Sequence, residues 1–148
     1  MDLRQIAVNL ATKYASLTPP ADEDPIVEAT STPGESIPNT PFVMVMTAEE
    51  PAEFSYGGQL RSGTLPFEVI FALEKSSDLE RQRIRLEKWA PVLLDATLVG
   101  IHLGLPTVVA NTWARSFEIG DIEYGGQTWA GVRLLVSVQT SEGISPTA

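Results

Sequence analysis

The sequence predicts an α+β domain with a mainly antiparallel sheet and long hairpins, in which an N-terminal helix and a second, kinked helix pack on one side. Strand-like segments come in groups with helical segments between them, without the regular alternation of a parallel sheet. The motif Tyr-Gly-Gly-Gln occurs at Tyr56 and again at Tyr124, each time before a strand-like run, which is typical of hairpin tips. The length of 148 residues fits one domain, residues 1–148.

The two copies of this motif are out of phase with the strands that follow them. The large apolar residues after the first copy are Leu65, Phe67, Val69, Phe71 and Leu73, and those after the second are Val132, Leu134, Val136 and Val138. Counted from the tyrosines, the two sets differ by one residue, which would turn opposite strand faces inward. The difference favours recurrent turn chemistry, and an ancient internal repeat is the alternative.

The first element is a helix that buries one stripe. Apolar residues recur at helical spacing from Leu3 to Leu17, and Asp2 is placed to cap the amino end. Thr18-Pro19-Pro20 ends the helix, because proline lacks an amide and clashes with the preceding turn. Residues 18–41 then form an acidic, Pro-rich extended loop, with a short strand expected near 26–29 and ordering of the loop on assembly as one option.

A buried strand and a long hairpin follow the loop. The run from Pro41 to Met46 is apolar throughout and predicts a buried strand. Residues 53–73 predict a hairpin with its tip at 57–63.

The second helix begins near Ser77 and Glu80, which have the spacing of a capping box. Its apolar side includes Leu86, Trp89 and Leu93, and Pro91 should kink or split it near Ala90. Three strand candidates follow at 107–117, 121–124 and 128–139. We expect a bulge or bend at Gly120, a tight reversal at Gly125-Gly126, and a loose tail over 141–148.

The composition narrows the classes of function. The formal charge of −9 argues against a general nucleic-acid binder, which needs a basic face. The chain has no cysteine and no run of 18 apolar residues, so we expect no disulfide, no thiolate metal site and no membrane span.

The residues that could perform catalysis are few. The single histidine, His102, lies in a Gly-punctuated apolar turn and is expected to be structural. The Asp22-Glu23-Asp24 triplet lacks the spaced ligands and glycine of a calcium loop. Phosphate-loop, dinucleotide and serine-elbow motifs are missing from the sequence, although carboxylates distant in sequence could still meet in space. We therefore assign no catalytic, cofactor-binding or metal residues, and expect a protein that is not an enzyme.

Charge is segregated along the chain, which indicates contacts within the fold or between copies. Arg81, Arg85 and Lys88 form a basic stripe at helical spacing. The stripe is either a solvated face with local pairs such as Arg83 with Glu87, or a docking face for acidic residues 22–28 or 49–53 of another copy. We predict Trp89 in the core and leave Trp113 and Trp129 as core or interface. The full set of subunit-interface candidates is Arg81, Arg85, Lys88, Asp22, Glu23, Asp24, Glu49, Glu50, Tyr56 and Tyr124.

Several short stretches spread over nearly the whole chain carry a family resemblance. They are Leu3 to Ala7, Thr18 to Pro20, Asp24 to Val27, Ile37 to Pro41, Ser62 to Phe67, Leu93 to Asp95, Leu103 to Leu105 and Tyr124 to Gly126. In these the chain resembles the tail-terminator, or tail-completion, proteins of long-tailed bacteriophages, especially those of actinobacterial phages. The stretches are signatures of turns and packing.

The resemblance implies a non-enzymatic subunit without cofactors that forms a homo-oligomeric ring, usually a hexamer. Such a ring sits on the head-proximal end of the tail tube, ends tube growth and meets the head-tail connector, with the genome DNA only passing through its bore. The implied partners are thus the chain itself, the major tail tube protein and the connector or stopper protein. The implied location is the virion, after assembly in the host cytoplasm. The alternatives are another neck component, such as a stopper or adaptor, and a small ligand-binding domain.

Overall fold

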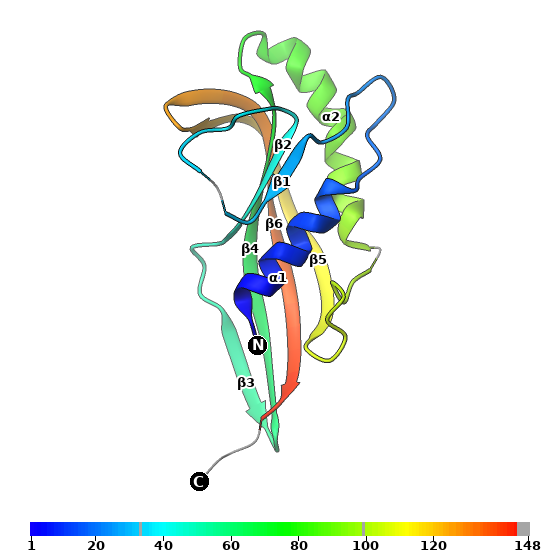
Figure 1. Cartoon of the computed structure of the whole chain (residues 1–148), viewed down its shortest axis with the longest axis vertical. Coiled ribbons are helices and arrows are strands. Elements are labelled where there is room, and N and C mark those ends of the chain that lie inside the picture. The colour runs from blue at the N-terminus through cyan, green and yellow to red at the C-terminus, as the bar shows by residue number, and fades with distance from the viewer. Residues whose placement is uncertain (33, 99, 145–148) are drawn as a thin grey trace.

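The fold is a six-stranded sheet with two helices packed on one face (Figure 1). A computed structural model describes residues 1–32, 34–98 and 100–144. The strand order is β1-β2-β4-β6-β5, and β3 pairs with β4 further along the same edge as β2. Only β1 and β2 run parallel, so the predicted α+β class with a mainly antiparallel sheet is confirmed. The strands are β1 Glu28–Thr30, β2 Phe42–Thr47, β3 Glu53–Gly57, β4 Leu60–Lys75, β5 Val109–Tyr124 and β6 Gln127–Gly143.

Helix α1, Leu3–Ala15, matches the predicted first helix and its cap. The Asp2 side chain accepts a hydrogen bond from the Gln5 amide, which satisfies one of the free N–H groups of the first turn. The buried stripe packs over β1 and β2 and consists of Ile6, Ala7, Leu10, Ala11 and Tyr14.

Helix α2, Leu79–Asp95, is a single element that packs over β5 and β6 and continues into a 3₁₀ turn, η1, Ala96–Leu98. Pro91 lies inside the helix without splitting it. The predicted cap was wrong by one residue, since Asp78, and not Ser77, caps the helix by accepting from the Arg81 amide. An aspartate can replace a serine here because both place a short side-chain oxygen over the first turn.

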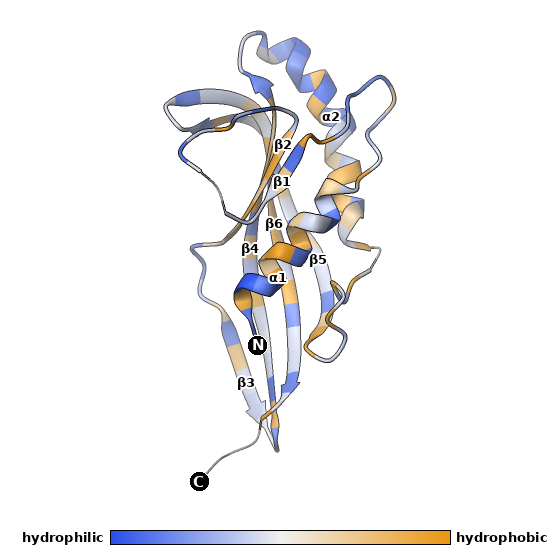
Figure 2. Ribbon diagram, viewed as in Figure 1, coloured by the Kyte–Doolittle hydropathy of each residue, from blue (hydrophilic) through white to orange (hydrophobic). Residues whose placement is uncertain are grey.

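Strands β4 and β6 form the centre of the sheet and place alternate residues on its two faces. On the helix face, their apolar residues join α1 and α2 in the main core. On the other face a smaller cluster is covered by the segment before β2, through Ile37. Figure 2 shows the apolar colours concentrated beside the helices, whereas the lower ends of β4 and β6 are mostly pale or blue. The smaller cluster consists of Ile37, Phe42, Met44, Ile70, Ala72, Ile122 and Trp129.

The strands predicted at 107–117 and 121–124 form one continuous strand, β5. The bulge or bend predicted at Gly120 between them is not present. Gly120 pairs directly with Gly131, and the register shifts fall instead between Val109 and Asn111 and between Ala114 and Ser116. A side chain at Gly131 would come within 2.2 Å of the Phe71 carbonyl oxygen on β4. The glycine at 131 thus permits close approach of two strands, which is another role of glycine in sheets.

The predicted loose tail and the predicted hairpin tip both need correction. Residues 141–143 belong to β6, because the lower half of β4 extends far enough to pair with them. Residues 145–148 lie outside the described residues. The first tip is confined to Gly58 and Gln59, and Gly63 lies within β4.

The repeated Tyr-Gly-Gly-Gln motif closes its two hairpins with different turns. In the first hairpin Gly57 pairs with Leu60, so the corners are Gly58 and Gln59, with a positive φ at Gly58. In the second, Tyr124 pairs with Gln127, and both corner glycines have positive φ. These are the patterns of type II′ and type I′ turns, respectively. The corners differ by one position relative to the tyrosine, which accounts for the phase difference and supports recurrent turn chemistry.

Candidate assembly surfaces

The predicted basic stripe on α2 is divided between the interior and the surface. Arg85 turns toward the protein and donates from Nε to Oε2 of Glu23 at 3.1 Å and from Nη2 to Oε1 at 3.0 Å. Its Nη1 donates to Glu74 on β4 at 3.0 Å. Arg85 therefore links the acidic loop, through Glu23, to strand β4 of the same chain, through Glu74.

Glu23 is the centre of this contact. Its side chain is only 5% exposed, and its Oε1 also accepts a hydrogen bond from the buried Trp89 indole at 3.0 Å. Burial acts to raise the pKa of Glu23, but the hydrogen bonds from Arg85 and Trp89 outweigh it and hold the pKa below its ordinary value. The carboxylate is thus charged, paired and desolvated.

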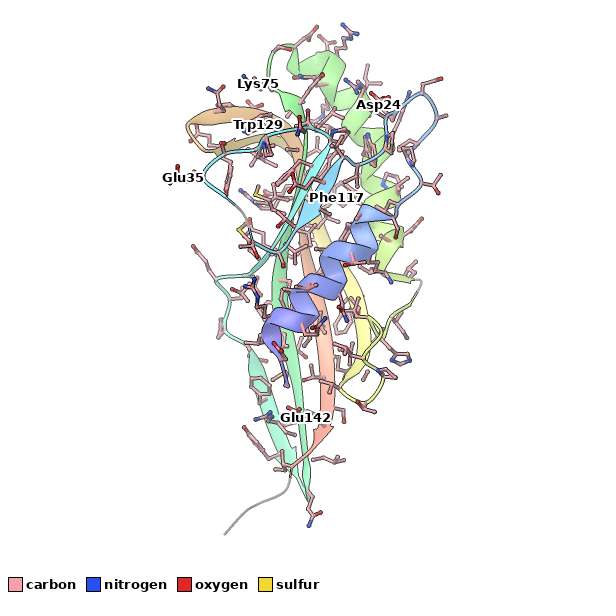
Figure 3. All side chains as sticks on the ribbon, in the orientation of Figure 1. Asp24, Glu35, Lys75, Phe117, Trp129 and Glu142 are labelled. Carbon is pink, nitrogen blue, oxygen red and sulfur yellow. The ribbon has the colours of Figure 1, made fainter. Side chains whose placement is uncertain are left out.

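Two of the predicted interface residues pair with each other within the chain. Glu23 is buried by this contact, whereas 31% of the Arg85 side chain stays exposed. Asp22 and Asp24 remain exposed, but they lie on the same loop beside α2, as the position of Asp24 at the upper right of Figure 3 shows. The loop and the helix occupy one flank of the molecule. They therefore cannot supply the two sides of a head-to-tail contact, which joins different surfaces of neighbouring copies.

The outward face of α2 keeps the other two predicted cations. Arg81 and Lys88 are exposed, and Ile84 lies between them with 59% of its surface exposed. The nearby Arg83 pairs with Glu87 at 3.5 Å, as predicted for positions i and i+4. The exposed face thus has an apolar centre with two cations.

The second acidic region, the turn between β2 and β3, is anchored to the sheet and presents two free carboxylates. The Ala48 amide donates to the Pro66 carbonyl at 3.0 Å, and Glu50 accepts from Arg115 at 2.7 Å. Glu50 is therefore used within the chain. Glu49 and Glu53 are exposed and make no ion pair with any described residue.

The β3–β4 hairpin and the end of β6 form an arm that extends beyond the helices (Figure 1). All five residues of β3 are exposed, and Phe54 and Tyr56 are 40% and 67% exposed. The Phe54 ring lies against Gly63, where an added Cβ would come within 2.4 Å of it. The predicted contact residue Tyr56 is therefore placed on a surface that a partner can reach.

Ion pairs hold the strands together near the tip of this arm. Arg61 lies over the Phe54 ring, 5.8 Å from its centroid, and pairs with Glu142 of β6. Glu142 also pairs with the amino terminus of Met1 at 3.1 Å, and Figure 3 places it in the lower part of the molecule. The hydrogen bond from Arg61 is the main cause that lowers the pKa of Glu142, against the opposing effect of burial. The aromatic surface of the arm is thus fixed from β4 and β6.

Tyr124, the other predicted contact tyrosine, is used within the chain. Its hydroxyl donates to the Gly34 carbonyl, and its own carbonyl accepts from the Trp129 indole at 3.2 Å. Trp129 is buried in the smaller cluster, while Trp113 is half-buried. Trp89 is fully buried, as predicted, with its ring 4.6 Å from that of Phe71 between centroids.

The carboxylates of Glu23 and Glu74 meet on Arg85, and the single histidine makes a contact with the backbone. His102 contacts the Val109 carbonyl through Nδ1 at 2.9 Å. Among the described residues, no three His, Cys, Asp or Glu side chains gather closely enough to hold a metal ion. Within the same residues, no helix has the length and apolar character needed to cross a bilayer.

An open cavity of about 670 Å³ lies between the carboxyl ends of α1 and α2. Lys13 is on its wall and donates to the Gly100 carbonyl at 3.0 Å, and Leu17, Val92 and Ala96 supply apolar lining. Burial lowers the pKa of Lys13. Sequence reasoning missed this site, since only the folded chain brings residues 13 and 100 together.

No protein-family model and no curated protein matches this chain.

Proposed function

We propose that this chain is a structural subunit of a bacteriophage tail, a tail terminator that forms a ring on the head-proximal end of the tail tube. In this proposal it is not an enzyme and takes no cofactor. Its partners are other copies of itself, usually six in the resembling family, the tail tube protein and the head-tail connector. It acts in the virion after assembly in the host cytoplasm.

The observation that carries this proposal is the arm. Strands β4 and β6 are 16 and 17 residues long, which at ~3.3 Å per residue corresponds to about 50 Å of continuous strand. The helices cover only part of that length (Figure 1). An edge strand that carries exposed aromatic side chains outside the core promotes aggregation of an isolated monomer. The same feature suits a subunit that contacts neighbouring subunits.

Two features of the arm support a specific contact. The outer edge of β3 is unpaired among the described residues, and an open edge can add a strand from another protein. The edge strand β5 differs, because it carries two register shifts and the charged residues Arg115, Glu118, Asp121 and Glu123. Those features discourage strand addition. Of these two edges, the arm is therefore the one that is open to a partner.

The test is to locate the protein on particles and to measure the tubes. An antibody against this chain should label one end of tail tubes in particles from the organism that encodes it, and loss of the chain should give tubes of uncontrolled length. The double variant F54S/Y56S should lose tube binding, while F117S, an exposed aromatic on β5 outside the arm, should retain it. Labelling of filled heads but not of tube ends would indicate a stopper or adaptor. Absence from particles would reject a virion role.

The cavity beside Lys13 supports the rival function of a small ligand-binding domain. Its lining is largely apolar, with one cation, Lys13, and one carboxylate, Asp95, which is the kind of site that binds small organic molecules. Ligand-induced shifts of the melting temperature in a screen of such compounds, abolished by K13A, would favour this rival.

A further inference from the structure

A ring needs two different surfaces on each copy, and the sheet places two charged surfaces on opposite flanks. Helix α2 packs over β5 and β6, at one end of the strand order. The acidic turn joins β2 to β3, on the other side of β4, and lies against the sheet face away from the helices, where Glu50 reaches across to Arg115 on β5. Figure 1 shows α2 and this turn on opposite flanks of the molecule. Contacts between such surfaces are head-to-tail and close into a ring when the rotation permits.

The charges of these two surfaces are opposite, and their side chains form no hydrogen bond or ion pair with a described residue, although Lys88 also acts electrostatically on Glu23 of its own chain. Arg81 and Lys88 make no side-chain hydrogen bond or ion pair with any residue that the structure describes. The same holds for Glu49 and Glu53 within the described ranges. The chain therefore satisfies Arg85, Glu23 and Glu50 internally and leaves two cations and two carboxylates for another contact.

The two surfaces also match in the order of their residue types. Arg81, Ile84 and Lys88 lie along α2 at about 0, 4.5 and 10.5 Å, from a rise of ~1.5 Å per residue. The chain bends at Glu49 and Glu50 and enters β3 at Glu53, with Pro51 exposed between Glu49 and Glu53. Both surfaces thus have an exposed apolar residue between two like charges.

We propose that α2 of one copy docks on the turn between β2 and β3 of the next copy. Arg81 and Lys88 pair with Glu49 and Glu53, and Ile84 packs against Pro51. The occupant is a second copy of this chain, because the complementary surface is present on the chain itself. This contact rests on the proposed ring and identifies which surfaces build it.

The ion pair between Glu50 and Arg115 fixes the conformation of the turn before the neighbouring copy binds. It holds the middle of the turn against the sheet, so less conformational entropy is lost when the neighbour docks. The contact is electrostatic at its rim and should weaken with salt, since the Debye length falls from ~10 Å at 0.1 M to ~3 Å at 1 M.

The test is a charge reversal with a compensating reversal, read by sedimentation velocity and native mass spectrometry. Each of R81E/K88E and E49K/E53K should weaken self-association about tenfold or more. The quadruple variant R81E/K88E/E49K/E53K should restore it, because the complementarity returns with reversed sign. The matched control R83A/E87A removes a charge pair from the same helix and should leave association unchanged. Circular dichroism checks that each variant is folded.

Covalent trapping makes the test valid for weak association. The chain has no cysteine, so I84C/P51C introduces only the designed pair. Oxidation should give a ladder of crosslinked species that ends at the ring size, and I84C alone should stop at dimers. Failure of the quadruple variant to recover, or absence of a ladder at the highest soluble concentration, overturns the contact.

The outcomes also separate this contact from the proposed function. A ladder from a protein that does not label tube ends would support the contact and reject the terminator role. Tube-end labelling that is unchanged in R81E/K88E and in E49K/E53K would support the terminator role and reject the contact.

Discussion

Removing the carboxylate of Glu23 should destabilise the fold much more than its place in an acidic surface loop implies. In E23A the buried Trp89 indole loses its acceptor, which costs about 1–3 kcal/mol. The charge-assisted bonds from Arg85 are also lost, at about 1.5–3 kcal/mol. Arg85 is 31% exposed and keeps Glu74, so water and that carboxylate recover part of the loss. We expect a net decrease of about 2–3 kcal/mol in the free energy of unfolding.

The conservative variant E23Q separates the charge from the hydrogen bond. The amide oxygen can still accept from Trp89, so we expect a decrease of about 1 kcal/mol at pH 7. The pKa of Glu23 is lowered in the folded state from its ordinary value of 4.5. The stabilisation by the charged form is therefore fully present above pH 4.5 and is lost as the pH falls through the folded pKa. The gap between wild type and E23Q should shrink below pH 4.5.

Urea unfolding at pH 7 and in steps down to pH 3 measures both effects. The matched control is D24N, which removes a neighbouring exposed carboxylate and should change stability by less than about 0.5 kcal/mol. If E23A and D24N destabilise equally, or if the gap to E23Q is independent of pH, the assignment of Glu23 as a buried anchor is wrong.

Three further substitutions, one of them with a matched control, test the packing by thermal or urea unfolding. The Tyr14 hydroxyl is buried without a hydrogen-bond partner in the described structure, so Y14F should stabilise by about 1 kcal/mol, and destabilisation would indicate a partner. G131A should lower the free energy of unfolding by ~3 kcal/mol, because its Cβ would meet the Phe71 carbonyl. The control G120A lies on the paired strand with open space around it and should cost less than about 1 kcal/mol. Equal effects of the two would refute the close approach at Gly131. P91A should stabilise α2 by about 1–3 kcal/mol by restoring a backbone donor, unless the helix needs the proline to fit the sheet.

The regular elements could be predicted because their signals are local. The stripe of α1 and its Asp2 cap depend on residues within one or two turns, and both are confirmed. The inward residues of β4 and β6 follow from alternation alone. The same local logic failed at Gly120, because only the pairing with β6 shows that the strand continues through it.

The candidate surfaces were less predictable, because burial of a charge depends on residues far away in sequence. Glu23 is separated by 62 positions from Arg85 and by 66 from Trp89. One signal was present: a buried tryptophan needs an acceptor for its N–H, and Arg85 lies one turn before Trp89 on the same side of the helix. That pattern predicts a nearby carboxylate, but it does not identify which of the acidic residues supplies it.

The separation of the arm from the body has an evolutionary consequence. Adding two residues to each of β3 and β4 beside the type II′ corner would lengthen the arm by ~6.6 Å and leave the corner on a hydrogen-bonded pair, while every residue from Leu65 onward kept its face and its neighbours. The distance that the arm spans can therefore drift in small steps without selection against lost stability. Under the proposed function, variants of this chain with longer or shorter arms would fit partners of different diameter while the rest of the fold stayed the same.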